Sequence, residues 1–432
     1  MTLTDRDHSL LLRLLTTPTA GPLEVGATGP PPRLWRAQHD YAEAAARIGF
    51  RVVRHAPADH TDLSVPGVPE TVREAAADPD FLTCQPSLVL RLGPDTVPPE
   101  RTVMFNVHLD TVAGGPPAHF DGEVFHGRGA IDAKGPAVAL LAGVRAAGER
   151  SAALGRDSAV IIQAVAGEEG GAMGVLGTRP LVERGHVGRL NVFCEPTSGR
   201  FLTRSTASMT ARVSVRGDDA IDDRPHTGHN ASVLLGFIAQ SMGRSLDGRA
   251  HDGAVCVAGL RTGDLHNRVY GTGDLLLNLS YAEPEAGRAL EAAVTDAFEM
   301  ALKEFTDLFG DGTLFARTAA DAPRITRLTW PKRGLPVLDD HDRWGHDLLR
   351  GIGVPTWPAD EAAFTCDAIW MAGIAGTCTV VLGPGDLAAD GAHGDDERAH
   401  LSDLDGFADT VARILAAFTD EAGEPDETYG GP

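Results

Sequence analysis

Two adjacent glutamates, Glu168 and Glu169, follow the apolar run at 159–162, at a point where a buried strand should be ending. Neighbouring carboxylates repel each other, so this position needs a positive partner. A divalent metal ion would supply that partner and would let the two side chains divide the work. One glutamate would bind the metal, while the other would take a proton from a water whose pKa the metal lowers.

Four further segments place ligand-type side chains after an apolar run or in a glycine-rich turn. They are "NVHLDTV" with His108 and Asp110, "GRGAIDAKG" with Asp132, "FCEPTSG" with Glu195, and "GAHGDDERAHL" with His393. Two histidines and three carboxylates suffice for two divalent metals that share one bridging carboxylate. Nitrogen and oxygen ligands suit zinc, with cobalt or manganese as alternatives.

His108 and Asp110 are separated by one residue of extended chain, so their side chains point the same way. We therefore expect the Asp110 carboxylate to accept the second ring N–H of His108, which is the usual way in which a ligating histidine is oriented.

Each motif alone has a simpler explanation. A lone aspartate in a loop is usually a cap or a turn residue, a lone histidine is usually a satisfied polar group, and paired glutamates usually lie on a solvated helix face. Five such motifs, each after a strand or a glycine turn, favour a metal centre instead. The carboxyl ends of strands are also where open α/β sheets form their sites.

The segments around these side chains alternate between predicted strands and predicted helices. Short apolar runs bounded by Gly, Pro or Asp predict strands at 87–92, 102–108, 158–165, 189–194 and 378–382. Helical periodicity occurs at 6–16, 34–48 and 134–148. This alternation predicts an α/β fold with a mixed, mostly parallel sheet flanked by helices. Residues 55–80 are rich in Pro and Asp, and we expect them to form a surface insertion.

The middle of the chain reads differently. Residues 209–216 and 273–281 alternate as half-buried antiparallel strands do, and helical patterns lie at 230–243 and 286–307. The predicted strand at 378–382 is again a short apolar run like those before residue 203. We therefore expect an α+β domain at 203–330, inserted into a discontinuous domain of residues 1–202 and 331–432. The acidic, apolar-poor tail at 421–432 is expected to be disordered.

Charge and composition exclude several classes of function. The net charge of −22 would repel the phosphates of nucleic acids and of anionic membranes. Five cysteines without a CxxC spacing predict free thiols. No run approaches about 18 unbroken apolar residues, and the N-terminal apolar stretch is too short for a signal peptide. We expect a cytoplasmic protein.

The motifs also occur in a specific order over most of the chain. They are "VHLDTV", "GRGAIDAKGPAVALLAG", "GEEGGAMG", "CEPTSG", "RPHTGHNA", "GDLHN", "TCDA" and "GPGD…AHGDDERAHL". In this order they resemble the co-catalytic di-zinc amidohydrolase and exopeptidase family of aminoacylase, acetylornithine deacetylase, succinyl-diaminopimelate desuccinylase and bacterial glutamate carboxypeptidase. The resemblance implies an α/β catalytic domain interrupted by a lid domain that often serves dimerisation.

The resemblance also implies residue roles. One metal is held by Asp132 with His108 and Glu195, and the other by the same Asp132 with Glu169 and His393. Glu168 is then the general base that activates a metal-bridged water and later protonates the leaving amine, and Asp110 orients His108.

The chain departs from the family pattern in the inserted domain. Counting from Gly217, the place of the family's lid histidine holds Ile221. That histidine donates to the developing oxyanion, and the loss of one such donor typically costs roughly 10²–10³ in rate. Ser280 and Ile369 stand where many relatives carry arginine. These changes favour a substrate without a free carboxylate at the usual place, with Ile221 and Ile369 forming an apolar wall.

Two histidines near the altered position, His226 and His229, offer another explanation. Either could take over the missing role, although loop positions that face water are the simpler interpretation. Asn230 and, in the "GDLHN" motif, Asn267 are further candidate substrate contacts.

Three functions remain open. The leading one is di-metal-dependent hydrolysis of the amide bond of an N-acyl amino acid, a small peptide or a related amide. The second is an enzyme that transfers or condenses acyl groups on the same scaffold. The third is a non-catalytic binding homologue, against which Glu168 argues, because it would be a needless buried charge. Expected partners are the small-molecule substrate and, through the inserted domain, a second copy of the chain.

Overall fold

The computed structural model describes residues 3–26, 29–247 and 253–421. The chain divides into two compact units. Unit 1 lies within residues 1–205 and 338–432, and unit 2 comprises residues 206–337.

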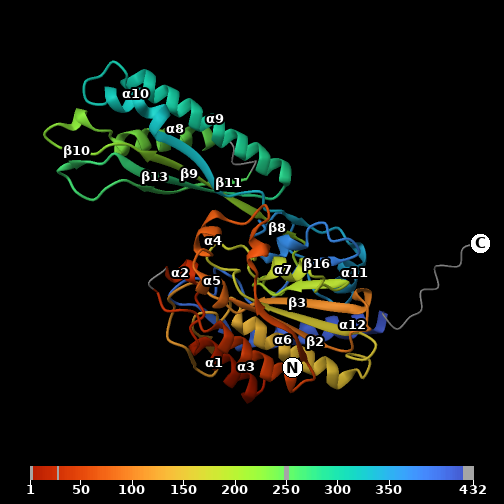
Figure 1. The fold of residues 1–432 in the computed structure, drawn as a ribbon. Coiled ribbons are helices and arrows are strands. Elements are labelled where there is room, and N and C mark those ends of the chain that lie inside the picture. Colours follow the sequence, from red (N-terminus) through yellow and green to blue (C-terminus); the bar gives the residue numbers. More distant parts are fainter. Residues whose placement is uncertain (1–2, 27–28, 248–252, 422–432) are drawn as a thin grey trace, which may run out of the picture. The chain divides into compact units, whose positions relative to one another are not determined.

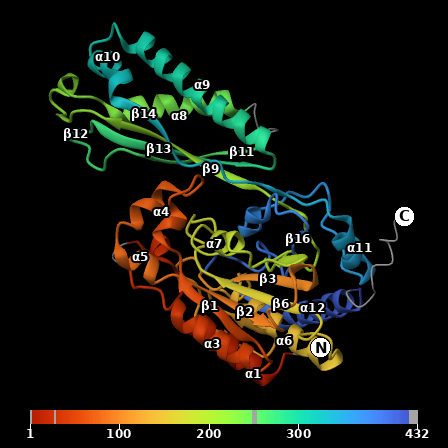
Figure 2. The same cartoon turned by 45° about the vertical axis from the view of Figure 1, so that its right-hand side comes forward.

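Unit 1 is built on a six-stranded sheet in the order β1-β2-β6-β3-β7-β16 (Figures 1 and 2). Its strands are β1 Arg51–Pro57, β2 Pro86–Leu92, β3 Thr102–His108, β6 Ala159–Val165, β7 Leu190–Phe193 and β16 Cys378–Val381. The four strands from β6 to β16 pair in parallel, whereas β1 with β2 and β2 with β6 pair antiparallel. The predicted mixed, mostly parallel sheet is confirmed.

Both faces of the sheet are buried at β2, β6, β3, β7 and β16, which explains why these strands are mainly apolar, whereas the edge strand β1 is exposed. Along β3, Val103, Phe105 and Val107 pack into one core with five helices, while Met104 packs into a second core on the opposite face. The helices of the first core are α1 Asp5–Thr16, α3 Leu34–Ala46, α6 Lys134–Arg150, α11 Arg343–Gly351 and α12 Leu401–Glu421. The second core includes α7 Thr178–Glu183 and the 3-10 helix Asp367–Met371.

Shorter elements complete unit 1. The helices are α2 Pro22–Val25, α4 Glu70–Ala75 and α5 Pro79–Thr83, with 3-10 turns at His60–Leu63 and Pro99–Arg101. Strands β17 Arg398–His400, β5 Val124–His126 and β4 His119–Phe120 form a small sheet, and β15 Leu338–Asp339 pairs with β8 Arg204–Ser205.

The segment 55–80 is more than the predicted surface insertion. Leu63, Val68 and Val72 are buried in a cluster that includes Val175 and Leu176, in the loop region after Glu169. Scattered apolar residues between Pro and Asp gave no periodic signal, yet they support the loop that carries the two glutamates.

Unit 2 is an antiparallel four-stranded sheet in the order β11-β13-β9-β14. Its strands are β9 Ala207–Arg216, β11 Ala254–Arg261, β13 Thr272–Tyr281 and β14 Thr326–Lys332. Helices α8 Ala231–Asp247, α9 Pro284–Phe309 and α10 Ala316–Ile325 accompany the sheet, and β10 Ala220–Ile221 pairs with β12 Arg268–Val269. Leu275, Leu277 and Leu279 of β13 are buried at every second position, in agreement with the predicted alternation.

Among the described residues, no helix combines the length and apolarity needed to cross a membrane. The five cysteines are free thiols, as expected. The tail from residue 422, for which disorder is predicted, lies outside the described residues.

Candidate metal centre

The first predicted ligand set meets at the carboxyl ends of two neighbouring parallel strands. His108 is the last residue of β3, and Glu195 follows the end of β7. The His108 Nε2 atom lies 2.8 Å from Asp132 Oδ1 and 3.9 Å from Glu195 Oε2. All three side chains are buried, so they form a compact, water-poor donor set of one nitrogen and two carboxylates.

The second predicted set is more open to solvent. The His393 Nε2 atom lies 3.0 Å from Asp132 Oδ2 and 3.0 Å from Glu169 Oε1. The His393 side chain is 53% exposed, and its backbone has a φ of +66°. The structure therefore brings all five predicted ligands together, with one set closed and the other accessible.

Asp132 stands between the two sets and faces one imidazole with each carboxylate oxygen. Burial alone would raise the pKa of Asp132, but the hydrogen bonds from His108 and His393 hold that pKa well below its ordinary value. The same two hydrogen-bond partners of His393, Asp132 and Glu169, raise the pKa of its ring to about 10. This is the geometry expected of a bridging carboxylate.

The carboxyl groups around Asp132 outnumber the imidazoles. Burial and the nearby negative charge of Asp367 raise the pKa of Glu168 well above its ordinary value. Burial raises the pKa of Glu195 to about 8, and it also raises the pKa of Glu169. Ligand atoms of His108, Glu168 and Glu169 lie within 4.8 Å of one another. Such crowding of hard oxygen donors with two nitrogens fits a pair of dications.

Asp110 orients His108 in a different way from the one predicted. The His108 Nδ1–H donates to the main-chain carbonyl of Asp110 at 3.0 Å, while the Asp110 carboxylate lies 3.8 Å from Nδ1. That carboxylate instead accepts the backbone N–H of Glu169 at 3.1 Å. Asp110 thus fixes the tautomer of His108, which leaves Nε2 for a metal, and also holds the glutamate loop.

A buried ion pair between Arg128 and Glu397 supports the centre and was missed by sequence reasoning. Glu397 Oε1 accepts the backbone N–H of Gly129 at 2.9 Å and that of Asp132 at 3.3 Å. Arg128 donates to the carbonyl oxygen of His393 at 3.2 Å. Both residues lie inside quoted motifs, but nothing in their local sequence indicates that they pair.

Asp367, in the "TCDA" motif, is a third residue without a predicted role. Its Oδ2 atom accepts the hydroxyl of Thr178 at 2.5 Å, its Oδ1 atom is buried without a hydrogen bond, and burial raises its pKa to about 7. A Cβ on Gly174, whose φ is +67°, would lie 2.4 Å from that carboxylate. The glycine in "GEEGGAMG" therefore makes room for Asp367.

Several expectations for substrate contacts need correction. His229 is buried, with Nδ1 accepting the backbone N–H of Asp218 at 2.8 Å and Nε2 donating to Asp321 at 2.9 Å, so both ring nitrogens are used inside unit 2. Asn230 caps α8 by accepting the backbone N–H of Val233 at 3.0 Å.

One member of the expected apolar wall, Ile369, also needs correction. Ile369 is completely buried in the 3-10 helix of unit 1, so it packs in the interior, whereas Ile221 is 58% exposed on β10. His226 and Asn267 are exposed, and their contact with a substrate stays a prediction.

Known proteins resemble this chain in sequence and in fold. A protein of Aeropyrum pernix, provisionally assigned as a LysW-lysine/LysW-ornithine hydrolase, is 32% identical over 197 residues, which is 45% of this chain and 51% of that protein. The chain thus matches about half the length of this curated relative.

Solved structures share the fold over nearly the whole chain. A tripeptidase of Staphylococcus aureus superposes with a TM-score of 0.68 at 16% identity, covering 97% of this chain and all of that one. An M20 family metallo-carboxypeptidase of Sulfolobus solfataricus gives a TM-score of 0.67 at 11% identity, covering 96% of this chain and all of that one.

The profile of peptidase family M20/M25/M40 matches residues 104–417. This span contains the five candidate ligands and Glu168, and it confirms the resemblance drawn from the motifs. The chain belongs to peptidase family M20/M25/M40, a family of metal-dependent peptidases and amide hydrolases.

Proposed function

We propose that this protein is a metal-dependent hydrolase that cleaves the amide bond of an N-acyl amino acid, a small peptide or a related amide. The observation that carries the proposal is the position of Asp132, whose two carboxylate oxygens each face a different histidine of a different ligand set. Family membership and the shared fold support the same reaction class.

His108, Asp132 and Glu195 would hold one divalent metal, and Asp132, Glu169 and His393 the other. Zinc suits this set of nitrogen and oxygen donors, with cobalt or manganese as alternatives. When bound, the metal pair supplies Lewis-acid activation of water and of the scissile carbonyl. Asp110 and the Arg128–Glu397 pair keep the ligands in place through the contacts described above.

Glu168 carries the proton transfers in this proposal. One of its carboxylate oxygens takes a proton from the attacking water and later delivers it to the nitrogen of the leaving amine. A general base works best when its pKa lies near the working pH, and burial moves the pKa of Glu168 upward from its ordinary value. Its neighbour Glu169 has the different task of binding metal, so the adjacent glutamates have separate roles.

Two observations bear on which amide is the substrate. The Aeropyrum pernix relative is named as a hydrolase of LysW-lysine and LysW-ornithine, so amides of lysine and ornithine belong among the first substrates to test. The absence of the lid histidine at Ile221 favours an acyl group or amine that differs from those of ordinary relatives. Recognition by Asn267 or His226 and dimerisation through unit 2 stay predictions.

The test combines metal depletion with a substrate panel. The protein is stripped with a chelator, reconstituted with zinc, cobalt or manganese, and assayed on N-acetyl and N-succinyl amino acids, dipeptides, and acylated lysine and ornithine. We expect hydrolysis that disappears on stripping and returns when the two catalytic sites are filled. Reconstituted protein that hydrolyses none of these, but joins an activated acyl donor to an amine, would instead identify an acyl-transfer enzyme.

A further inference from the structure

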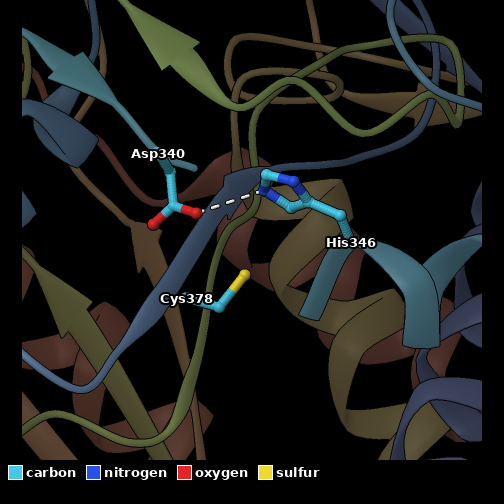
Figure 3. A group of neighbouring side chains, drawn as sticks. All are labelled: Asp340, His346 and Cys378. Atoms are coloured by element: carbon cyan, nitrogen blue, oxygen red, sulfur yellow. Dashed lines mark ion pairs between the residues drawn. The ribbon is translucent and has the colours of Figure 1, made fainter. Parts of the chain in front are cut away.

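A second group of metal-binding side chains lies in unit 1, at the opposite ends of the strands from the catalytic candidates. Asp340 follows β15, His346 lies in the first half of α11, and Cys378 is the first residue of β16. Figure 3 shows the three side chains converging from these separate elements. One oxygen, one nitrogen and one sulfur atom from them lie within 4.8 Å of one another.

The ring of His346 has a buried nitrogen that makes no hydrogen bond, as a nitrogen that binds a metal ion would. Its Nε2 atom lies 3.1 Å from Asp340 Oδ1, yet Nε2 is buried and makes no hydrogen bond. The ring nitrogen is therefore close to the carboxylate without being aimed along the line between them. The His346 side chain is 10% exposed, and buried polar atoms without a partner are uncommon in folded proteins. Two ligands of one metal ion are close to each other in this way, because each directs a lone pair at the ion.

The Asp340 carboxylate is held rigidly. Its Oδ1 accepts the backbone N–H of Asp342 at 2.9 Å, and its Oδ2 accepts the backbone N–H of Thr379 at 2.9 Å. Backbone donors of this kind orient metal-binding carboxylates in known sites and leave further lone pairs available. The guanidinium of Arg189 pairs with the carboxylate of Asp342 at 2.9 Å.

The sulfur of Cys378 lies close to the same carboxylate and imidazole. A Cβ on Gly345 would lie 2.2 Å from Cys378 Sγ, so the thiol touches the backbone of α11 immediately before His346. Cys378 is completely buried between the helix and the sheet. Its position is set by the strand, because it pairs in register with Leu190 of β7.

We propose that Asp340, His346 and Cys378 bind a zinc-type divalent ion at a site separate from the catalytic centre. Thiolate, imidazole and carboxylate together are a donor set that selects zinc, and three protein ligands leave a fourth tetrahedral position for water. Bound there, the ion ties α11 to the sheet.

The two metal sites are distant from each other. Glu195 comes five residues after Leu190, the strand partner of Cys378. At about 3.3 Å per residue, these groups lie roughly 15 Å apart along the sheet. The inference is therefore independent of the proposed hydrolytic function.

Cobalt distinguishes the sites, because cysteine thiolate bound to Co²⁺ gives a charge-transfer absorption in the near ultraviolet that nitrogen and oxygen ligands do not. The catalytic set contains no sulfur. The full-length chain carrying Cys84→Ser and Cys256→Ser, which removes the two thiols that are not fully buried, is loaded with cobalt, and its absorption and cobalt content per chain are measured.

We expect this parent protein to show the absorption. Cys378→Ser and His346→Gln should each abolish it and lower the cobalt content by one ion per chain, with the far-ultraviolet circular dichroism unchanged. Cys366→Ser, which changes another buried thiol, is the matched control and should keep the absorption. No absorption in the parent, or an absorption that survives either Cys378→Ser or His346→Gln, would overturn the proposal.

Discussion

Arg128 and Glu397 form a buried ion pair that connects the loop of Asp132 to the loop of His393. Arg128 and Glu397 are 269 positions apart in the sequence, and unit 2 interrupts the chain between them. The pair thus holds together ligands that belong to both predicted metal sites.

Replacing Glu397 by glutamine should weaken this connection. The change leaves the Arg128 guanidinium buried without its counter-charge, and breaking a buried pair costs about 3–5 kcal/mol of stability. Metal affinity should also fall by about 10- to 100-fold, as it does when outer supports of ligands are lost. Urea unfolding and zinc titration measure the two effects.

The control is Glu291→Gln, which removes the partner of Arg333 in an exposed pair and should change stability far less. Equal effects of the two variants would contradict this role for Glu397.

Close packing of α6 against α12 makes a second prediction. A Cβ on Gly143 would lie 2.6 Å from the carbonyl oxygen of Ala408 and 2.6 Å from Val411 Cβ. Gly143→Ala should therefore destabilise unit 1 by about 1–3 kcal/mol, although alanine favours a helix. Gly148→Ala on the same helix meets nothing within 4 Å and should stabilise by up to about 1 kcal/mol. Thermal unfolding that ranks the two variants in the opposite order would exclude a tight contact here.

Asp7 couples stability to pH. Burial would raise its pKa, but two hydrogen bonds from Arg145, at 2.9 and 2.7 Å, together with those from Thr4 lower the pKa below its ordinary value. The charged carboxylate therefore stabilises the fold above about pH 4, and this contribution is lost as the pH falls through the folded-state pKa.

The comparison of wild type with Asp7→Asn checks this sign. The difference in urea midpoint should be largest near neutral pH and should close in acid. Asp5→Asn, on an exposed position of the same helix, serves as the control and should show little difference at any pH. A gap between wild type and Asp7→Asn that widens in acid would refute the assignment.

The strands with a regular apolar pattern could be predicted because the pattern reflects which of their faces are buried. Strands β3 and β6 are buried along their whole length and mainly apolar since both of their faces are covered, and β13 alternates since one face is covered. Strand β11 was missed because its sequence, AVCVAGLR, does not alternate between apolar and polar residues as the other strands of unit 2 do, and most of its residues are exposed although it pairs with β13.

The ligand residues could be named from their motifs, whereas their supports could not. The pairing of Arg128 with Glu397 joins residues 269 positions apart, and no local pattern encodes such a partner. The contact from His108 to the carbonyl rather than the carboxylate of Asp110 depends on backbone direction at the strand end. The burial of Ile369 likewise follows from the 3-10 helix around it, not from its apolar character.

The histidines of unit 2 should separate into structural and exposed classes. His229→Ala removes the acceptor of the Asp218 N–H and the donor to Asp321, which should cost about 1–3 kcal/mol. Hydrogen exchange of the amides around residue 218 should speed up accordingly. His226→Ala changes an exposed side chain and should leave exchange unaltered; a higher KM in this variant would indicate substrate contact. Unchanged exchange in His229→Ala would argue against the structural role.

Glu168 provides the most direct test of the account. Glu168→Gln keeps the size of the side chain and removes its ability to accept a proton, while the five metal ligands stay in place. Metal content and turnover of the best amide substrate are measured on the same preparation. We predict the same number of divalent ions per chain as in wild type and a turnover lower by about 10²–10⁴, the usual contribution of a general base. A fully metal-loaded Glu168→Gln protein that hydrolyses the substrate at the wild-type rate would contradict the proposed mechanism.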